Sequence, residues 1–447
     1  MSVVVRFAPS PTGYLHAGNA RIALINWLYA KAHGGRFILR LDDTDAARVK
    51  PEYVAAIGED LAWLGIDWRD EPVRQSARLA LYQEAANRLK AQGRLYPCYE
   101  TAAELDAKRK LQAAAHKPPL YDRTGLKLTA DERARLEAEG RRPHFRFLLD
   151  HRTISYDDLV RGPTTIETAS QSDPVLIKED GTVLYTLASV VDDAALGITH
   201  VIRGEDHVTN TGTQIELFEA LGASAPRFGH LSLLIGADGA PLSKRIESLA
   251  LKNLRADGIE TLALASFLAK LGTGDPLEPI NALGDLAKGF ALDRFGKAPA
   301  RFDPAELSSL SARTIHAMSF ERARPRLSAL GLGAADAAYW NAVRGNLARL
   351  DDAKTWWPVI NGPLVPVIED AAFAMLAASL LPDDRLDGTS WGLWTKRIAE
   401  ASGRKGKALF HPLRLALTGR GDGPAMADLL PLIGRERALA RLAGHTS

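Results

Sequence analysis

The first fifty residues constrain the fold of this chain more than any other stretch. Residues 3–7 (Val-Val-Val-Arg-Phe) have the composition of a buried strand, residues 9–13 form a Pro- and Gly-containing turn, and residues 19–32 carry apolar side chains at helical spacing. A Gly-Gly pair ends this helix, and residues 36–41 predict a second strand. The unit is therefore βαβ, which predicts a parallel sheet with ligands at the carboxyl ends of its strands.

His16 and Gly18 lie where the turn leads into the predicted helix. Backbone N–H groups and the positive end of the helix dipole favour a phosphate ligand at such a position. The alternative interpretation is that His16 only caps the helix or packs against it. This stretch alone supports the two interpretations equally.

Composition bounds the class of protein. The chain has 447 residues, enough for about three domains of ~150 residues each. Its 56 Lys and Arg and 54 Asp and Glu give a net charge of +2, so an RNA partner would need local basic patches. Cys98 is the single cysteine, which excludes an intrachain disulfide and is typical of a reducing compartment. The sequence shows neither a signal peptide nor an apolar run of ~20 residues, so we expect a cytoplasmic protein without a membrane segment.

Periodicity, capping boxes and turn signals predict the elements further along the chain. The predicted helices span residues 51–65, 79–92, 187–195, 213–221, 261–271 and 304–310, with two more opening at the capping boxes Thr101–Glu104 and Thr129–Glu132. The predicted strands span residues 144–149, 164–168, 199–203 and 231–235, with a hairpin over 175–178 and 182–185 around Asp180-Gly181. After residue 249 the pattern is mostly helical.

Two distant motifs carry a resemblance to a known family. Residues 10–18 (Ser-Pro-Thr-Gly-Tyr-Leu-His-Ala-Gly), followed by residues 40–45 (Arg-Leu-Asp-Asp-Thr-Asp), resemble the N terminus of the bacterial glutamyl-tRNA synthetases, whose class I signature is His-x-Gly-x. Residues 238–245 (Asp-Gly-Ala-Pro-Leu-Ser-Lys-Arg) resemble the second signature of that class, a Lys-Met-Ser-Lys-Ser loop. Further matches at residues 185–193, 201–205 and 405–414 extend the resemblance over nearly the whole chain.

The resemblance implies an α/β fold with a Rossmann-type parallel-sheet catalytic domain, an inserted α+β acceptor-binding segment and an all-α C-terminal anticodon-binding domain. The expected boundaries place the catalytic domain at residues 1–300 and the helical domain at residues 301–447. Within the first, the Rossmann halves would span about 1–92 and 186–240, the insertion about 93–185, and the signature loop with a stem-contact region about 241–300.

The implied activity is glutamate–tRNA ligation, in which ATP activates L-glutamate and the acyl group passes to the terminal adenosine of tRNA(Glu), of tRNA(Gln), or of both. His16 and Lys244 would be the catalytic residues, and Mg²⁺ would be held mainly by the ATP phosphates. The implied ATP-binding residues are His16, Gly18, Asn19, Ser243, Lys244 and Arg245. The implied glutamate-binding residues are Arg6, Ala8, Ser10, Asp42, Tyr185, Ser189 and Arg203.

Three positions depart from the family pattern. Asp42 stands where the glutamyl enzymes usually have Glu, Ser189 replaces a usual Asn, and Pro241 replaces the first Lys of the second signature. Glutaminyl-tRNA synthetases have an Asp at the first of these positions, so a glutaminyl enzyme is an alternative. Against it stand the Pro-Ser-Pro-Thr-Gly turn and the helical C-terminal part. A second alternative is a non-catalytic tRNA-binding paralogue, which retention of both signatures disfavours.

Two expectations concern metal and RNA. Some family members hold zinc in the insertion with several cysteines, and because Cys98 has no second cysteine we expect no zinc and no protein-bound metal. Between residues 396 and 420 there are seven Lys and Arg and one Glu, a local charge of +6 beside Trp391, Trp394 and Phe410, which suits an RNA backbone with loop bases stacked on these rings. The candidate tRNA-binding residues in this patch are Lys396, Arg397, Arg404, Lys405, Lys407 and Arg414. The family expectation for the oligomeric state is a monomer.

Overall fold

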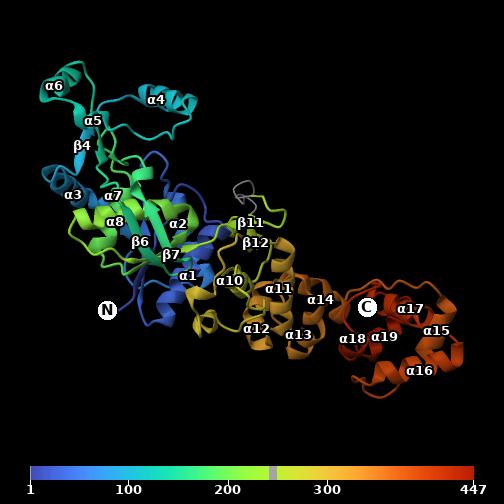
Figure 1. Ribbon diagram of the computed structural model, residues 1–447. Helices are drawn as coiled ribbons and strands as arrows, with labels where there is room; N and C mark the ends of the chain where they lie inside the picture. The colour runs from blue at the N-terminus through green and yellow to red at the C-terminus, as the bar shows by residue number, and fades with distance from the viewer. Residues whose placement is uncertain (1, 241–248) are drawn as a thin grey trace. The chain divides into compact units, whose positions relative to one another are not determined.

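A computed structural model describes residues 2–240 and 249–447 of the chain (Figure 1). The chain divides into two compact units, one formed by Met1–Leu254 and Ala265–Asp303 and the other by Arg255–Leu264 and Pro304–Ser447. Among the described residues, no helix is both long and apolar enough to cross a membrane.

The first unit is built on parallel strands. β1 pairs with β2 and β2 with β3, while β9 pairs with β10, all in parallel. The two groups meet where the Thr199 N–H donates to the Val4 carbonyl, 2.9 Å away, which puts the start of β9 beside β1. The strand bounds are β1 (Val4–Phe7), β2 (Arg36–Leu41), β3 (Val73–Arg74), β9 (His200–Gly204) and β10 (Arg227–Leu231).

Helices connect these strands, as parallel pairing requires. α3, α7 and α8 bury an apolar cluster against the sheet, in which Ile38 of β2, Val201 of β9 and Phe228 of β10 take part. α1 lies on β1 and β9, and its Asn26 side chain donates to the Ile202 carbonyl at 3.0 Å. The helix bounds are α1 (Ala17–Ala32), α2 (Pro51–Leu64), α3 (Leu79–Ala91), α7 (Tyr185–Ala195) and α8 (Val208–Ala220).

An inserted segment separates α3 from α7. It holds a three-stranded antiparallel sheet of β4, β5 and β8, and a separate antiparallel hairpin of β6 and β7 (Figure 1). The hairpin lies beside β10, because the Leu159 N–H donates to the Phe228 carbonyl at 2.9 Å. The bounds are β4 (Leu95–Cys98), α4 (Ala102–Ala114), α5 (Thr124–Lys127), α6 (Ala130–Ala138), β5 (His144–Phe147), β6 (Thr153–Asp158), β7 (Gly162–Glu167) and β8 (Val175–Ile177).

The described part of the chain after β10 contains few strands. β11 (Leu234–Gly236) and β12 (Ala300–Phe302) pair in parallel, with α9 (Leu251–Ala256) and α10 (Thr261–Lys270) between them in the sequence. The second unit is helical from Pro304 on, and Figure 1 shows these helices in orange and red. They are α11 (Pro304–Ala317), α12 (Phe320–Ala329), α13 (Ala337–Val343), α14 (Ala353–Asn361), α15 (Ala371–Ser379), α16 (Ser390–Ser402), α17 (Lys407–Thr418), α18 (Met426–Ile433) and α19 (Arg435–Leu442).

The sequence predicted the strongly periodic elements well and several boundaries wrongly. Both capping boxes form, with Thr101 capping α4 and Thr129 capping α6. The strand expected over residues 231–235 is two strands, β10 and β11, and the hairpin arm expected over 182–185 is a single bridge at Val183. β6 was not predicted, because its residues are mostly polar although its burial alternates as in a strand.

Candidate active site

A cavity of about 790 Å³ opens at the carboxyl ends of β1 and β9, where the two strand groups of the first unit meet. Open parallel sheets bind ligands at such a point because the connections on either side diverge. Of the residues singled out in the sequence, the cavity is lined by Arg6, Ala8, Ser10, His16, Gly18, Asn19, Asp42, Tyr185 and Arg203.

One end of the cavity is the start of α1, with His16 as its N-cap. His16 Nδ1 accepts a hydrogen bond from the Gly18 N–H at 3.1 Å, and the Asn19 side chain accepts from the His16 N–H at 3.4 Å. Burial lowers the pKa of His16 below its usual value, so the ring is neutral at pH 7. Because Nδ1 accepts, the ring proton sits on Nε2, which can donate to a phosphate oxygen.

The backbone donors at this end are largely satisfied by the protein. The Gly18 N–H is bonded to His16, and the Ala17 N–H donates to the Leu249 carbonyl at 3.0 Å. The expectation of free N–H groups at the helix start was therefore wrong for these two residues. His16 does cap α1, and its imidazole Nε2 is one donor that this end can offer to a ligand.

The other end of the cavity rests on a buried network of charges. Arg40 donates through Nε and Nη2 to Asp42 at 2.7 and 3.2 Å, and through Nη1 to Asp193 at 2.7 Å. Arg6 donates to the same Asp193 at 3.1 and 3.3 Å. Burial opposes the charge of Arg40, but Asp42 and Asp193 outweigh it and raise its pKa. The two carboxylates are thereby held in place beside the cavity.

Arg203 differs from Arg6 and Arg40 in having no carboxylate partner within 4 Å among the described residues. Its Nη1 donates to the Tyr185 hydroxyl at 3.3 Å, while its other donors bond to His230, Thr211 and the His207 carbonyl. Its side chain is only 5% exposed, and burial lowers its pKa. A buried guanidinium without a counter-ion is a strong site for a ligand carboxylate.

Not every candidate residue reaches the cavity. Ser189 is fully buried in α7, and its hydroxyl donates to the Tyr185 carbonyl at 2.7 Å instead. Arg21, Asp206 and His207 line the cavity although the sequence did not single them out. Arg21 donates to the Ser232 and Leu271 carbonyls, partners too distant in sequence for any local pattern to indicate.

The candidate residues Ser243, Lys244 and Arg245 lie outside the described residues. The chain on either side of them belongs to the cavity region. Leu234 lines the cavity before this stretch, and after it the Leu249 carbonyl accepts from the first residue of α1. The bridge between His16 and Ala250 makes the same connection.

The insertion brings together three possible metal ligands. Cys98, Glu100 and His144 have ligand atoms within 4.8 Å of one another, an arrangement that the cysteine count did not anticipate. The set holds one sulfur, fewer than the thiolate-rich zinc sites of structural type. Burial raises the pKa of the Cys98 thiol to about 11, and Tyr121 donates to it at 3.3 Å. Glu100 Oε2 and His144 Nε2 are buried without a hydrogen-bond partner among the described residues.

The basic patch of the second unit is only partly available to RNA. Lys396, Arg397, Lys405 and Lys407 are exposed. Arg404 is paired with Asp370, and Arg414 donates to the Pro424 carbonyl at 2.9 Å. Trp394 is fully buried, so its expected stacking on a base was wrong. Phe410, 44% exposed, and the half-buried Trp391 are the aromatic groups that could stack on one.

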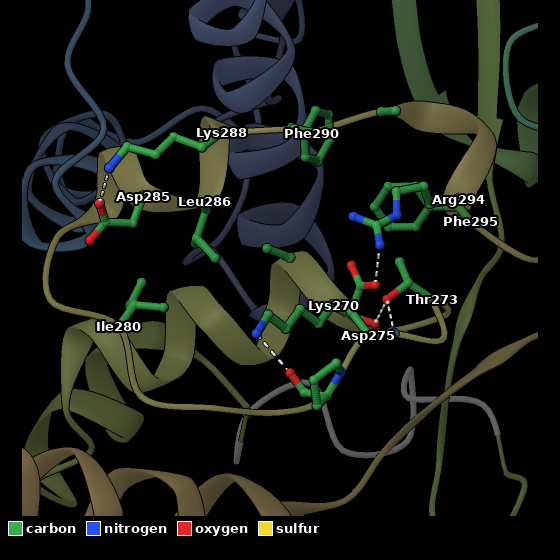
Figure 2. Close-up of a pocket in the computed structure, with 14 residues that line it drawn as sticks. Lys270, Thr273, Asp275, Ile280, Asp285, Leu286, Lys288, Phe290, Arg294 and Phe295 are labelled. Atoms are coloured by element: carbon green, nitrogen blue, oxygen red, sulfur yellow. Dashed lines mark hydrogen bonds and ion pairs between the residues drawn. The ribbon is translucent and has the colours of Figure 1, made fainter.

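A second cavity of about 250 Å³ lies in the segment between residues 269 and 295 and shares no lining residue with the first (Figure 2). Its charged side chains are already engaged: Lys288 with Asp285, Arg294 with Asp275, and Lys270 with the Pro276 carbonyl (Figure 2). The remaining lining is largely apolar. The charged groups of this cavity are therefore less available to bind a charged ligand.

Comparison with known proteins gives concordant matches over the whole chain. Residues 2–309 match the family model described as tRNA synthetases class I (E and Q), catalytic domain, and residues 386–445 match an anticodon binding domain. A glutamate–tRNA ligase of Methylobacterium sp. (strain 4-46) is 57% identical over 100% of both chains, and one of Maricaulis maris is 54% identical over 99% of both.

A solved structure agrees with these sequence matches. It is a glutamate tRNA ligase from Elizabethkingia meningosepticum in complex with its amino acid, with a TM-score of 0.86 and 28% identity. The likeness covers 99% of this chain and 98% of that one.

Proposed function

This chain belongs to the class I tRNA synthetases of the glutamate and glutamine type and is a glutamate–tRNA ligase, and we propose that its cavity at β1 and β9 binds glutamate at the Arg203 end and ATP at the His16 end. The reaction joins the amino-acid carboxylate to the α-phosphorus of ATP, releases pyrophosphate, and passes the acyl group to tRNA. Catalysis then consists chiefly of positioning and of stabilising negative charge.

The observation that carries the glutamate site is the charge balance of its buried residues. Arg6 and Arg40 share the carboxylates of Asp42 and Asp193, and Arg203 is left without one among the described residues. The positive charge of Arg203 suits the side-chain carboxylate that distinguishes glutamate from glutamine. Glutamine carries no net charge and would leave Arg203 uncompensated, at a cost of ~1 to 3 kcal/mol or more.

The proposed orientation of glutamate follows from the same residues. Arg203 Nη1 and the Tyr185 hydroxyl receive the side-chain carboxylate, with Arg6 beside them. Asp42 receives the α-ammonium with lone pairs that Arg40 leaves unused, since an ionised carboxylate accepts about four hydrogen bonds. Ala8 and Ser10 line the wall between these groups.

At the ATP end we propose that His16 Nε2, Gly18 and Asn19 contact the nucleotide and that Lys244, with Ser243 and Arg245, stabilises the departing pyrophosphate. The contact of Leu249 with the first residue of α1 brings the chain back to this end of the cavity shortly after these three residues in the sequence, which supports the proposed role. Mg²⁺ would be carried by the phosphates and would neutralise part of their charge. Lys244→Ala should abolish charging and leave tRNA affinity within a few-fold of wild type.

The test of the function is ATP–pyrophosphate exchange with glutamate or glutamine, run with and without tRNA. We expect exchange with glutamate and little with glutamine. Exchange that prefers glutamine would overturn the proposed pocket chemistry, and its absence under every condition would overturn the activity of the cavity. Charging of purified tRNA(Glu) and tRNA(Gln) then decides whether one or both are substrates.

Three further parts of the proposal concern the rest of the molecule. We propose that the exposed basic residues of α16 and α17 bind tRNA. We also propose that the protein is a monomer of the cytoplasm, where its substrates are found, and that the insertion holds no zinc. Metal analysis tests the last point: one zinc per chain would refute it and assign the metal to Cys98, Glu100 and His144. Light scattering of the purified protein tests the oligomeric state.

A further inference from the structure

Two buried residues that do not line the cavity, Asp158 and His230, stand behind Arg203. His230 lies on β10 directly opposite Arg203 in the parallel register. Its Nε2 accepts from Arg203 Nε at 3.1 Å, and its Nδ1 is hydrogen-bonded to Asp158 Oδ2. Asp158, at the end of β6, belongs to the inserted segment. The three side chains form a chain of contacts that runs from the insertion to the cavity.

The donors and acceptors at each end of this chain fix the tautomer of His230. Arg203 Nε can only donate, so His230 Nε2 has to be unprotonated. The Asp158 carboxylate can only accept, so His230 Nδ1 carries the proton. Burial lowers the pKa of His230 and Arg203 lowers it further, whereas Asp158 opposes them. The neutral ring with its proton on Nδ1 is therefore the form that satisfies both neighbours.

Asp158 is itself held by the backbone. Its Oδ1 accepts from the N–H groups of Val160 and Arg161, each at 2.9 Å, and from the His230 N–H at 3.1 Å. Its side chain is fully buried. Burial opposes its ionisation, but the bonds from His230, Arg161 and Val160 lower its pKa overall. The carboxylate is thus a fixed acceptor for His230.

The contacts of His230 decide how Arg203 is presented. His230 occupies the Nε side of the guanidinium, and Thr211 occupies Nη2 at 2.8 Å. The remaining nitrogen, Nη1, lies with the Tyr185 hydroxyl at the cavity. If the guanidinium rotated, a different nitrogen would face the cavity. Recognition of a carboxylate by a guanidinium depends on this orientation.

We propose that His230 is a positioning residue that orients Arg203 for the glutamate side-chain carboxylate, and that Asp158 of the insertion sets the tautomer His230 needs for this. The inference rests on the proposed function, since it deepens the glutamate site at Arg203. Selection of the substrate therefore depends on two residues that never touch it. A serine protease triad works by the same logic, in which a buried Asp fixes the tautomer of a His.

The first experiment compares two replacements of the imidazole. Asn places its amide where Nδ1 stands and keeps the bond to Asp158, whereas Gln places its carbonyl where Nε2 stands and keeps an acceptor for Arg203. We expect His230→Asn to raise the KM for glutamate ~10- to 100-fold and His230→Gln to change it by less than about threefold. The KM for ATP should stay within about twofold in both variants.

The second experiment reverses the tautomer. In Asp158→Asn the carboxamide can donate to His230 Nδ1, and the ring proton then moves to Nε2. There it faces the Arg203 Nε–H, so that two donors meet and the hydrogen bond between the two side chains is lost. We expect a rise in the glutamate KM of at least tenfold. Gln at position 230 has no tautomer for Asp158 to set, so the double variant Asp158→Asn with His230→Gln should have a lower glutamate KM than Asp158→Asn alone.

A purely structural role predicts other results. If the thermal midpoint falls in all variants while their glutamate KM values stay equal to wild type, the inference is wrong. The same holds if the Asn and Gln replacements at position 230 behave alike, or if the double variant is worse than Asp158→Asn. A wild-type enzyme that shows no glutamate-dependent exchange would instead refute the proposed function, so the two failures are distinguishable.

Discussion

The two ends of the cavity are built in different ways. At the His16 end, four consecutive residues form a helix cap whose hydrogen bonds join neighbours two or three positions apart. At the Arg203 end, the charges come from β1, β2, α7 and β9, and the Arg6 and Asp193 side chains that meet there are 187 residues apart in the sequence. The side-chain bonds of the first end are local, although its backbone also contacts Leu249, whereas those of the second end form only in the folded sheet.

Because of this difference, we expect substitutions at one end to change mainly the stability of the protein and substitutions at the other to change mainly the reaction rate. A buried charge network is expensive to leave incomplete, because each remaining ion keeps its desolvation cost without its partner. A helix cap contributes about 1 kcal/mol and can be replaced by other capping residues. Loss of one of the paired charges at the Arg203 end should therefore lower stability strongly, whereas changes at the His16 end should affect the reaction and spare the fold.

The largest effect should follow from Arg40→Met. Arg40 is fully buried, and its loss leaves Asp42 without its ion-pair partner and Asp193 with Arg6 alone. We expect the free energy of unfolding in urea to fall by ~3 to 5 kcal/mol. The matched control is Arg36→Met on the same strand, whose ion pair with Asp70 is 58% and 66% exposed and should matter by less than ~1 kcal/mol. Equal losses in the two variants would remove the distinction between the ends.

His16→Asn should come next, with its effect on rate instead of stability. Asn is among the most favourable N-cap residues, so the free energy of unfolding should stay within ~0.5 kcal/mol of the wild-type value. The side chain no longer reaches the phosphates, and we expect kcat in ATP–pyrophosphate exchange to fall ~100- to 1000-fold. His16→Ala is the control, which should lose the cap as well. Full activity in His16→Asn would leave His16 with the role of a cap alone.

The same contrast explains what the sequence could predict. The first strand, turn and helix, and both capping boxes of the insertion, depend on contacts within a few residues, and the sequence predicted them. The family motif also placed Arg6, Asp42 and Arg203 in one pocket. Nothing local indicated that Arg40 and Asp193 hold that pocket together, because their pairing depends on strand order.

The residues that were missed have a physical reason in common. Arg21 bonds to backbone carbonyls of Ser232 and Leu271, and His230 bonds to a residue of the insertion. A backbone carbonyl carries no sequence signal, and a lone His on a strand is usually a core residue. The exclusion of Ser189 from the cavity has a local cause, since its hydroxyl bonds back to the Tyr185 carbonyl of its own helix.

Gly18→Ala should have a smaller effect, again confined to chemistry. A Cβ at this position would lie 2.9 Å from His16 Cε1 and 3.0 Å from Nδ1, so the imidazole has to tilt. Ala gains up to ~1 kcal/mol in helix propensity, which offsets the strain. We expect kcat/KM for ATP to fall about tenfold with little change in stability. Gly58→Ala in α2, where the nearest atom is 4.0 Å away, is the control and should keep full activity.

The smallest effect should be the pH dependence of the cap. Burial lowers the pKa of His16 below its ordinary 6.5, so the unfolded chain binds a proton more readily than the folded one. Above pH 6.5 both states are neutral there and the cap is complete. As the pH falls below 6.5 the unfolded state takes up the proton first, and the stability that His16 provides declines until the folded-state pKa is reached. His16→Asn cannot titrate, so the stability of wild type relative to this variant should fall between pH 7.5 and pH 5.5 in urea unfolding. The comparison cancels the other histidines. Parallel curves would mean that protonation of His16 does not contribute to the stability of the folded state.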